Sequence, residues 1–235
     1  HINTVRSLCV DKNGRLISGS FDREIRVWDI ITGVCLRIMK GHTNFVFAMA
    51  VLENGRVVSG SHDGAIKVWD TTSGTCEATL DGFGYSIVHS ICSLRGGGFA
   101  SAHGSEDDRI RIWLPSSTTI SFDNGDESSS FICAKVFEGH RGYVRYLYQL
   151  PDGRLVSCSH DSTIKVWDIN TDADTNASGS CTRTIKVHSG AIRCLAVLPG
   201  CISVVSGGDD GNICITALDG HGLAEDDGES SDYGR

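Results

Sequence analysis

The chain has 235 residues, of which 40% are hydrophobic and 21% charged, as in an ordinary globular protein. Its formal net charge is −8, and the acids are concentrated after residue 218. Nowhere are lysines and arginines clustered, so we expect neither a nucleic-acid partner nor binding to an anionic membrane. No apolar stretch approaches the roughly 20 residues that span a bilayer, and no signal peptide is predicted.

One pattern recurs along the chain. It occupies residues 18–29, 59–70 and 157–168, with weaker versions at 103–114 and 206–217. Each copy has a short alternating run, a turn that begins with Asp, and a run rich in Ile and Val. The second run ends at Trp28, Trp69, Trp113 or Trp167, and at Thr216 in the fifth copy. Spacings of 41, 44, 54 and 49 residues predict a repeated unit with insertions.

The second repeat shows what the unit is. Its apolar runs at 46–52 and 56–61 flank Asn54-Gly55, a pair that suits a tight hairpin. The Asp63-Gly64 turn leads to a third run at 65–70, and Gly74 precedes a fourth at 76–80. No 3.6-residue helical periodicity is present. The sequence therefore predicts an all-β chain built from antiparallel meanders of four strands.

These repeats resemble the WD-repeat (WD40) family of β-propellers. The resemblance rests on Gly41-His42, Gly139-His140 and the Trp-Asp pairs at 28–29, 69–70 and 167–168. It implies four-stranded blades at residues 1–40, 41–81, 82–138, 139–186 and 187–218, followed by a disordered, acidic, Gly/Ser-rich tail at 219–235. We expect five blades of a ring of about seven, in a piece of a longer protein. The polar insertions at 116–130 and 170–180 are predicted to be mobile loops.

A Ser, a His and an Asp occur together in the well-formed repeats, as they would in a hydrolase. The set recurs with its Trp, however, whereas an active site is needed once. The resemblance implies buried hydrogen-bonded tetrads instead, and we predict no catalytic residue and a non-enzymatic protein. The third and fifth repeats have Asp107 and Asp210 but incomplete sets, which predicts softer blades. The tetrads are His1, Ser18, Asp22 and Trp28; His42, Ser59, Asp63 and Trp69; and His140, Ser157, Asp161 and Trp167.

A partner-binding rim is also implied by the resemblance, from three positions in each blade. Aromatic residues and arginine dominate it, as they do interface hot spots. The alternative is that Phe45 and Phe47 pack against a neighbouring blade. The predicted partner-binding residues are Arg6, Phe21, Phe45, Phe47, His62, His89, Tyr143, Arg145, His160 and Arg193; Thr4, Ile87, Glu106, Ala191 and Asp209 complete the positions.

Arg6, Arg145 and Arg193 share one of these positions, in the contexts VRSL, VRYL and IRCL. Pointing together they would form a receptor for carboxylates or phosphates. This is similar to the phosphopeptide-reading rims of WD-repeat substrate receptors in ubiquitin ligases, although arginine is common at this position in the family. We predict a scaffold or adaptor that binds a protein or peptide. The alternatives are a substrate-recognition subunit that reads an acidic or phosphorylated motif, and a structural subunit of a larger complex. No small-molecule substrate is evident.

The ten cysteines show neither a CxxC pair nor a Cys/His spacing typical of zinc, so we expect no metal and no cofactor. Four of them occupy one repeated position: Cys35, Cys76, Cys133 and Cys181. Equivalent positions on successive blades are too far apart for disulfides. The cysteines therefore predict reduced, buried thiols in an intracellular protein, cytoplasmic or nuclear.

Overall fold

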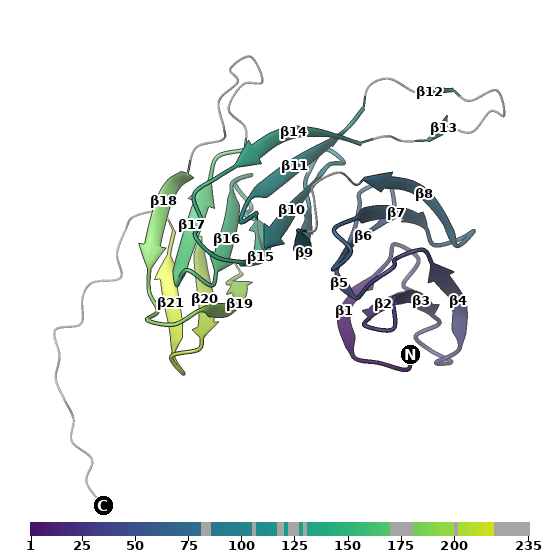
Figure 1. Ribbon diagram of the computed structural model, residues 1–235, viewed down its shortest axis with the longest axis horizontal. Coiled ribbons are helices and arrows are strands. Elements are labelled where there is room, and N and C mark those ends of the chain that lie inside the picture. Colours follow the sequence, from purple (N-terminus) through teal and green to yellow (C-terminus); the bar gives the residue numbers. More distant parts are fainter. Residues whose placement is uncertain are drawn as a thin grey trace, which may run out of the picture.

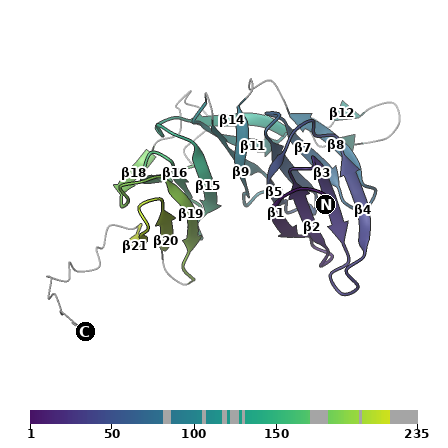
Figure 2. The same cartoon turned by 60° about the horizontal axis from the view of Figure 1, so that its bottom comes forward.

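The computed structural model describes residues 1–80, 86–104, 107–116, 120–121, 127–128, 131–169, 181–199 and 202–218. Within these ranges the ordered elements are strands, and five antiparallel sheets follow one another along an arc (Figures 1 and 2). Blade 1 consists of β1 (Val5–Val10), β2 (Leu16–Ser20), β3 (Glu24–Trp28) and β4 (Cys35–Lys40). Blade 2 consists of β5 (Val46–Val51), β6 (Val57–Ser61), β7 (Ile66–Asp70) and β8 (Thr75–Leu80).

The remaining blades repeat this order with one exception. Blade 3 consists of β9 (Ile87–Ser93), β10 (Phe99–Gly104), β11 (Ile110–Pro115) and β14 (Phe131–Phe137). Blade 4 consists of β15 (Val144–Gln149), β16 (Leu155–Ser159), β17 (Thr163–Trp167) and β18 (Cys181–Lys186). Blade 5 has three strands in the described part of the chain, namely β19 (Ile192–Val197), β20 (Ser203–Gly208) and β21 (Ile213–Ala217). The prediction of an all-β chain of antiparallel meanders is confirmed.

The insertion at 116–130 in blade 3 is described only in part, and its mobility stays a prediction. Two short strands, β12 (Ile120–Ser121) and β13 (Glu127–Ser128), pair with each other inside it. The insertion at 170–180 and the tail at 219–235 lie outside the described residues. No helix in the described ranges is long and apolar enough to cross a membrane.

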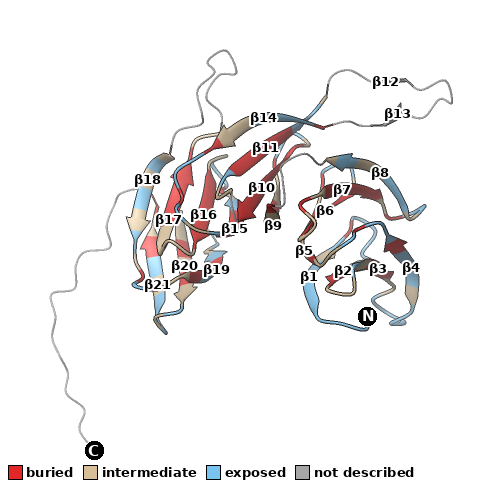
Figure 3. Cartoon of the chain, in the orientation of Figure 1, coloured by how far each residue is buried: buried red, intermediate tan, exposed pale blue. Residues whose placement is uncertain are grey.

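Hydrophobic clusters fill the spaces between successive blades, so the burial is highest on the central strands (Figure 3). Glycine permits the closest approach between blades 2 and 3. A Cβ on Gly60 of β6 would lie 2.3 Å from a methyl group of Val88 of β9. A larger residue would push these strands apart, which explains the repeated Gly in this part of the unit.

The two ends of the arc leave apolar faces uncovered. Equivalent isoleucines of the four earlier blades are at most 1% exposed, whereas Ile213 of β21 is 78% exposed. At the other end, Leu8 of β1 is 62% exposed, while Met49 at the same position of blade 2 is 8% exposed. A neighbouring blade buries this position elsewhere in the molecule. The arc is therefore a partial propeller.

The cysteines of the described residues are free thiols. Cys35, Cys76, Cys133 and Cys181 each lie opposite the tryptophan of their blade, where the ladder register shifts. Each donates its S–H to the carbonyl two residues further on, at 3.3–3.7 Å. The shared position thus has a shared local geometry. The prediction of buried thiols was wrong for Cys76, Cys133 and Cys194, which are exposed.

Candidate partner-binding surface

In blades 1, 2 and 4 the four predicted tetrad residues lie within hydrogen-bonding distance of one another. In blade 4, His140 Nδ1 lies 2.8 Å from Asp161 Oδ2, and His140 Nε2 lies 2.7 Å from Ser157 Oγ. Trp167 Nε1 donates to the same Ser157 Oγ at 2.8 Å. A neutral imidazole satisfies this chain, because Nδ1–H donates to the carboxylate and Nε2 accepts from the hydroxyl.

Blades 1 and 2 repeat the geometry closely. The histidine–carboxylate distances are 2.7 Å for His1 with Asp22 and 3.0 Å for His42 with Asp63. The imidazole lies 2.6 Å from the hydroxyl of Ser18 in blade 1 and 2.7 Å from that of Ser59 in blade 2. Trp28 and Trp69 each donate to the serine of their blade at 2.8 Å.

The tetrad carboxylates of blades 2 and 4, Asp63 and Asp161, are held in their charged form. Burial raises the pKa of Asp161, but hydrogen bonds from His140, Thr163 and the Arg141 N–H outweigh it and lower the pKa well below its usual range. Asp63 has the same balance of causes. The serines at the other end of these hydrogen-bond chains are inaccessible to solvent, since Ser59 and Ser157 are 0% exposed. A hydroxyl that is buried and bonded on both sides is a poor nucleophile, so this geometry stabilises a blade.

Blade 5 holds three of the four members of the set. His188 Nδ1 lies 2.9 Å from Asp210, and His188 Nε2 lies 2.9 Å from Ser206 Oγ. Only the tryptophan is missing, and the hydroxyl of Thr216 in its place is buried without a hydrogen-bond partner. The set of blade 5 is therefore incomplete by its tryptophan alone.

Blade 3 forms its hydrogen-bond chain with a different histidine. Trp113 Nε1 donates to Ser101 Oγ at 2.8 Å, as in the other blades. The histidine on that serine is His103, whose Nε2 lies 2.8 Å away. Asp107, the turn carboxylate, pairs instead with Arg111 at 2.5 Å. His103 was not predicted, although its spacing of two from Ser101 places both on one face of β10.

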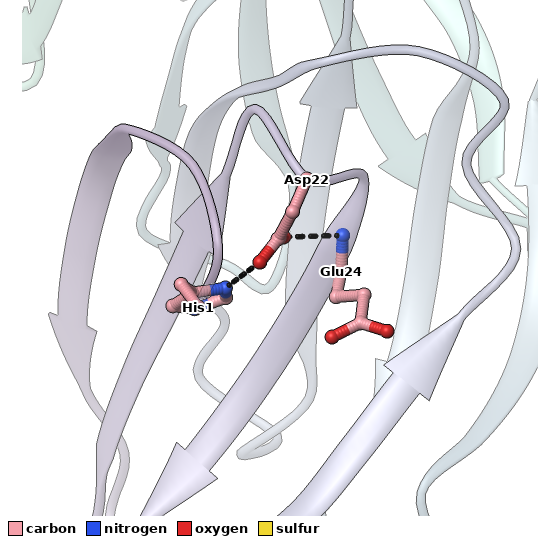
Figure 4. A group of neighbouring side chains, drawn as sticks. All are labelled: His1, Asp22 and Glu24. Carbon is pink, nitrogen blue, oxygen red and sulfur yellow. Dashed lines mark hydrogen bonds and ion pairs between the residues drawn. The ribbon is translucent and has the colours of Figure 1, made fainter.

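A possible metal-binding group, His1, Asp22 and Glu24, is explained by the same contacts (Figure 4). Both imidazole nitrogens of His1 are used by Asp22 and Ser18. The Glu24 carboxylate accepts from Arg26 at 2.8 Å and pairs with Lys40 at 3.1 Å. These atoms already bond to other side chains of blade 1, so the group is explained without a metal.

The predicted rim residues form a continuous row of rings, which we call the aromatic row. Phe21 stacks on Phe45, with ring centroids 4.5 Å apart, and lies 5.2 Å from Phe47. Contacts of 5.2–6.0 Å then continue across the blades, and each ring in the series is at least partly exposed. The aromatic row comprises Phe21, Phe45, Phe47, His62, His89, Tyr143 and His160.

Beside the aromatic row, the innermost strands of the five blades enclose a hollow of about 380 Å³. Arg6, Arg145 and Arg193 all line it, together with His89, and no described lining residue is acidic. Burial, followed by the charges of Arg6 and Arg193, lowers the pKa of Arg145. The structure thus brings the three predicted arginines to one place, which we call the arginine hollow.

The histidine of the arginine hollow is neutral. Burial and then the charges of Arg145, His160 and Arg6 lower the pKa of His89 to about 4. Arg145 NH1 lies 3.4 Å from His89 Nδ1 and can only donate, so Nδ1 accepts.

Arg193 differs from the other two arginines in having a carboxylate partner. Its Nε donates to Asp209 Oδ1 at 2.6 Å, and its NH2 bonds to Asp209 Oδ2. Its NH1 donates to His160 Nε2 at 3.1 Å. No ion pair involves Arg6 or Arg145 in the described ranges. Glu106, the predicted rim residue of blade 3, lies outside them.

The family model for the WD domain, G-beta repeat, matches residues 1–29, 33–70, 131–168 and 179–216, more than half of the chain. The chain belongs to the WD40 family. Each later match begins on or before the outer strand of one blade and ends in the third strand of the next. Strands β9, β10 and β11 fall outside the matched ranges, and they hold the WD-repeat blade in which His103 replaces the usual histidine.

Curated relatives include fungal WD-repeat proteins. The chain is 31% identical over 217 residues to "Nuclear distribution protein nudF 1" of Talaromyces marneffei, which covers 81% of this chain and 43% of that protein. It is 27% identical over 217 residues to "Nuclear distribution protein PAC1-2" of Uncinocarpus reesii, covering 82% of this chain and 42% of that protein. "Cell division control protein 4" of Saccharomyces cerevisiae is 29% identical over 192 residues, covering 72% of this chain and 23% of that protein. The chain thus spans less than half the length of these relatives.

Proposed function

We propose that this WD-repeat chain is a non-enzymatic protein-interaction module whose partner docks on the aromatic row. The observation that carries the proposal is the unbroken series of ring contacts from Phe21 to His160 across four blades. Partly exposed aromatic side chains are the groups that contribute most to protein interfaces. Their mutual stacking also holds them in place, which reduces the entropy lost on binding.

The competing explanation is that the phenyl rings serve only to join blades. Phe21 and Phe45 belong to different blades, so part of their contact does join blades 1 and 2. The row nevertheless retains exposure along its length, including Tyr143 at 38%. A surface whose rings both stack and remain accessible supports docking.

The test is site-specific photocrosslinking. A photoreactive phenylalanine analogue replaces Phe47, and in a matched variant it replaces Ile132, an exposed apolar residue of the outer strand β14. We expect a discrete crosslinked partner from the Phe47 position and none from the Ile132 position. Capture from Ile132 alone would instead favour a structural subunit that binds through the sides of its blades.

A second candidate function is recognition of an acidic or phosphorylated motif, as a substrate-recognition subunit would require. The arginine hollow favours it, because three guanidinium groups meet there without an acidic lining residue. Bidentate guanidinium contacts suit carboxylates and phosphates. The test is the affinity of one partner peptide with and without phosphorylation. Equal affinities would exclude a phosphate-reading site.

The cellular compartment is also proposed on chemical grounds. The described cysteines are free thiols, and such a set is typical of a reducing environment. We therefore propose an intracellular location. Fractionation of cells that express the tagged chain would test it.

A further inference from the structure

The three arginines of the arginine hollow occupy equivalent positions but have different neighbours. The residue before the turn Asp is Phe21 in the blade of Arg6, His160 in the blade of Arg145, and Asp209 in the blade of Arg193. Only the last of these can neutralise a guanidinium. Among the described residues, one arginine therefore has its own counter-ion and two do not.

The partner atoms of Arg193 are fully accounted for. Two of its nitrogens are taken by Asp209 and the third by His160. The hydrogen bonds with Asp209 raise the pKa of Arg193, while those with Arg193 lower the pKa of Asp209. Both side chains are nonetheless open to solvent, with exposed fractions of 49% and 44%. Ion pairs between exposed side chains contribute little to stability, so Arg193 can exchange this contact for one with another anion.

Arg145 is in the opposite situation. It is half-buried, and the neighbouring charges that act on it are Arg6 and Arg193. His89 beside it accepts a hydrogen bond and supplies no negative charge. An anion that entered the hollow would therefore meet two uncompensated guanidinium groups and a third that is already occupied.

We propose that Asp209 is an internal competitor for the ligand of the arginine hollow, and that a phosphoryl group binds there by taking Arg193 from Asp209. The inference rests on the second candidate function and specifies its chemistry. A phosphoryl dianion offers three acceptor oxygens and close to two charges, enough to engage Arg6, Arg145 and Arg193 together. A single carboxylate offers only two acceptor oxygens and one charge, so it compensates less for the loss of the Asp209 contact at Arg193. Asp209 thereby sets a threshold that a dianion exceeds and a monoanion does not.

The test uses N-acetyl-phosphoserine amide as the probe and N-acetyl-aspartate amide as the monoanionic control, titrated by NMR at pH 7.5. We expect the wild-type chain to bind the phosphoryl probe more than tenfold more tightly than the aspartate. The variant Asp209→Asn removes the competitor and retains the side-chain shape, so its affinity for the phosphoryl probe should rise about fivefold.

Asp152→Asn is the matched control. Asp152 also pairs with an arginine, Arg154, but in the hairpin at the opposite end of β15. This variant should bind the probe as the wild type does. Arg145→Gln should abolish binding in both the wild-type and the Asp209→Asn backgrounds, because the site then loses its half-buried charge.

The outcomes separate the two proposals. Binding of the probe with equal affinity to the wild type and Asp209→Asn would overturn the role of Asp209 and leave phosphate reading intact. An equal gain in Asp152→Asn would also overturn it, since the effect would then be one of net charge. Absence of probe binding in every variant would overturn phosphate reading itself. None of these results affects docking on the aromatic row.

Discussion

Blades 3 and 4 bond a buried serine to a tryptophan and a histidine, but the histidine comes from a different position in each. Both place a tryptophan N–H and an imidazole on one buried serine, with distances of 2.7–2.8 Å. In blade 4 the imidazole comes from His140, before the first strand, and its far side meets the turn carboxylate. In blade 3 it comes from His103, within the second strand, and the turn carboxylate meets Arg111. The packing of a blade thus requires a satisfied serine and tryptophan more than it requires a particular motif.

The histidine and the turn Asp of a WD repeat have two different roles. The histidine closes the hydrogen-bond chain from the tryptophan, and the turn Asp fixes the turn through backbone N–H groups. Blade 4 links the two roles through His140 and Asp161. In blade 3 the histidine bonds to Ser101 and the turn carboxylate Asp107 pairs with Arg111, whose charge also acts on His103.

The largest effect is expected from removal of the tryptophans. Trp113 and Trp167 are 2% and 0% exposed, and a buried Trp→Ala change costs about 3–5 kcal/mol of unfolding free energy. If the rearranged hydrogen-bond chain of blade 3 stabilises its blade as well as that of blade 4 does, Trp113→Ala and Trp167→Ala should lower the free energy of unfolding by similar amounts. Chemical denaturation measures both. A negligible loss of unfolding free energy for Trp113→Ala alone would show that blade 3 does not depend on its hydrogen-bond chain.

Acid should affect the buried histidine of blade 3, His103, before the tetrad carboxylate of blade 4, Asp161. Burial and then the charge of Arg111 lower the pKa of His103 to about 3, so the folded state keeps this ring neutral while the unfolded chain takes up a proton near pH 6.5. Stability therefore falls as the pH falls from about 6.5 toward 3. Between pH 7 and pH 5 this corresponds to about 2 kcal/mol.

Asp161 also loses its stabilising contribution on acidification, but in a lower pH range than His103. Its pKa is lowered, so its contribution is present above the unfolded value of about 3.9 and is lost only as the pH falls below that value. Denaturation of the wild type and His103→Gln at pH 7 and pH 5 tests the difference. The variant should lose less stability on acidification, and equal losses would contradict the assignment.

A smaller effect is expected from the serines. Ser157→Ala and Ser101→Ala each leave an imidazole and an indole N–H without their partner, at a cost of about 1–2 kcal/mol. Partner binding on the aromatic row should be unchanged, because these serines are buried. A folded Ser157→Ala protein that had lost a catalytic activity would instead favour the hydrolase alternative.

Much of the fold could be predicted because the same sequence pattern occurs in several repeats. The Asn-Gly and Asp-Gly hairpins, the Ile/Val runs and the Trp positions recur at one spacing, and each copy supports the others. His103 could not be found in this way, because it lies outside the repeated position and its role depends on the depth of β10 in the blade. The pairing of Arg193 with Asp209 was equally hidden, since the sequence placed both on the rim without showing that they touch. Exposure at the ends of the arc depends on which blades have a neighbour, which no single repeat records.

The most direct test of the docking proposal is the affinity of a purified crosslinked partner for the double variant Phe45→Ala/Phe47→Ala. These rings are central to the aromatic row, and the loss of hot-spot residues costs about 2 kcal/mol or more, which corresponds to at least about thirtyfold in Kd. The control Ile132→Ala should bind as the wild type does. A folded double variant with wild-type affinity would contradict the account and assign these rings to packing between blades.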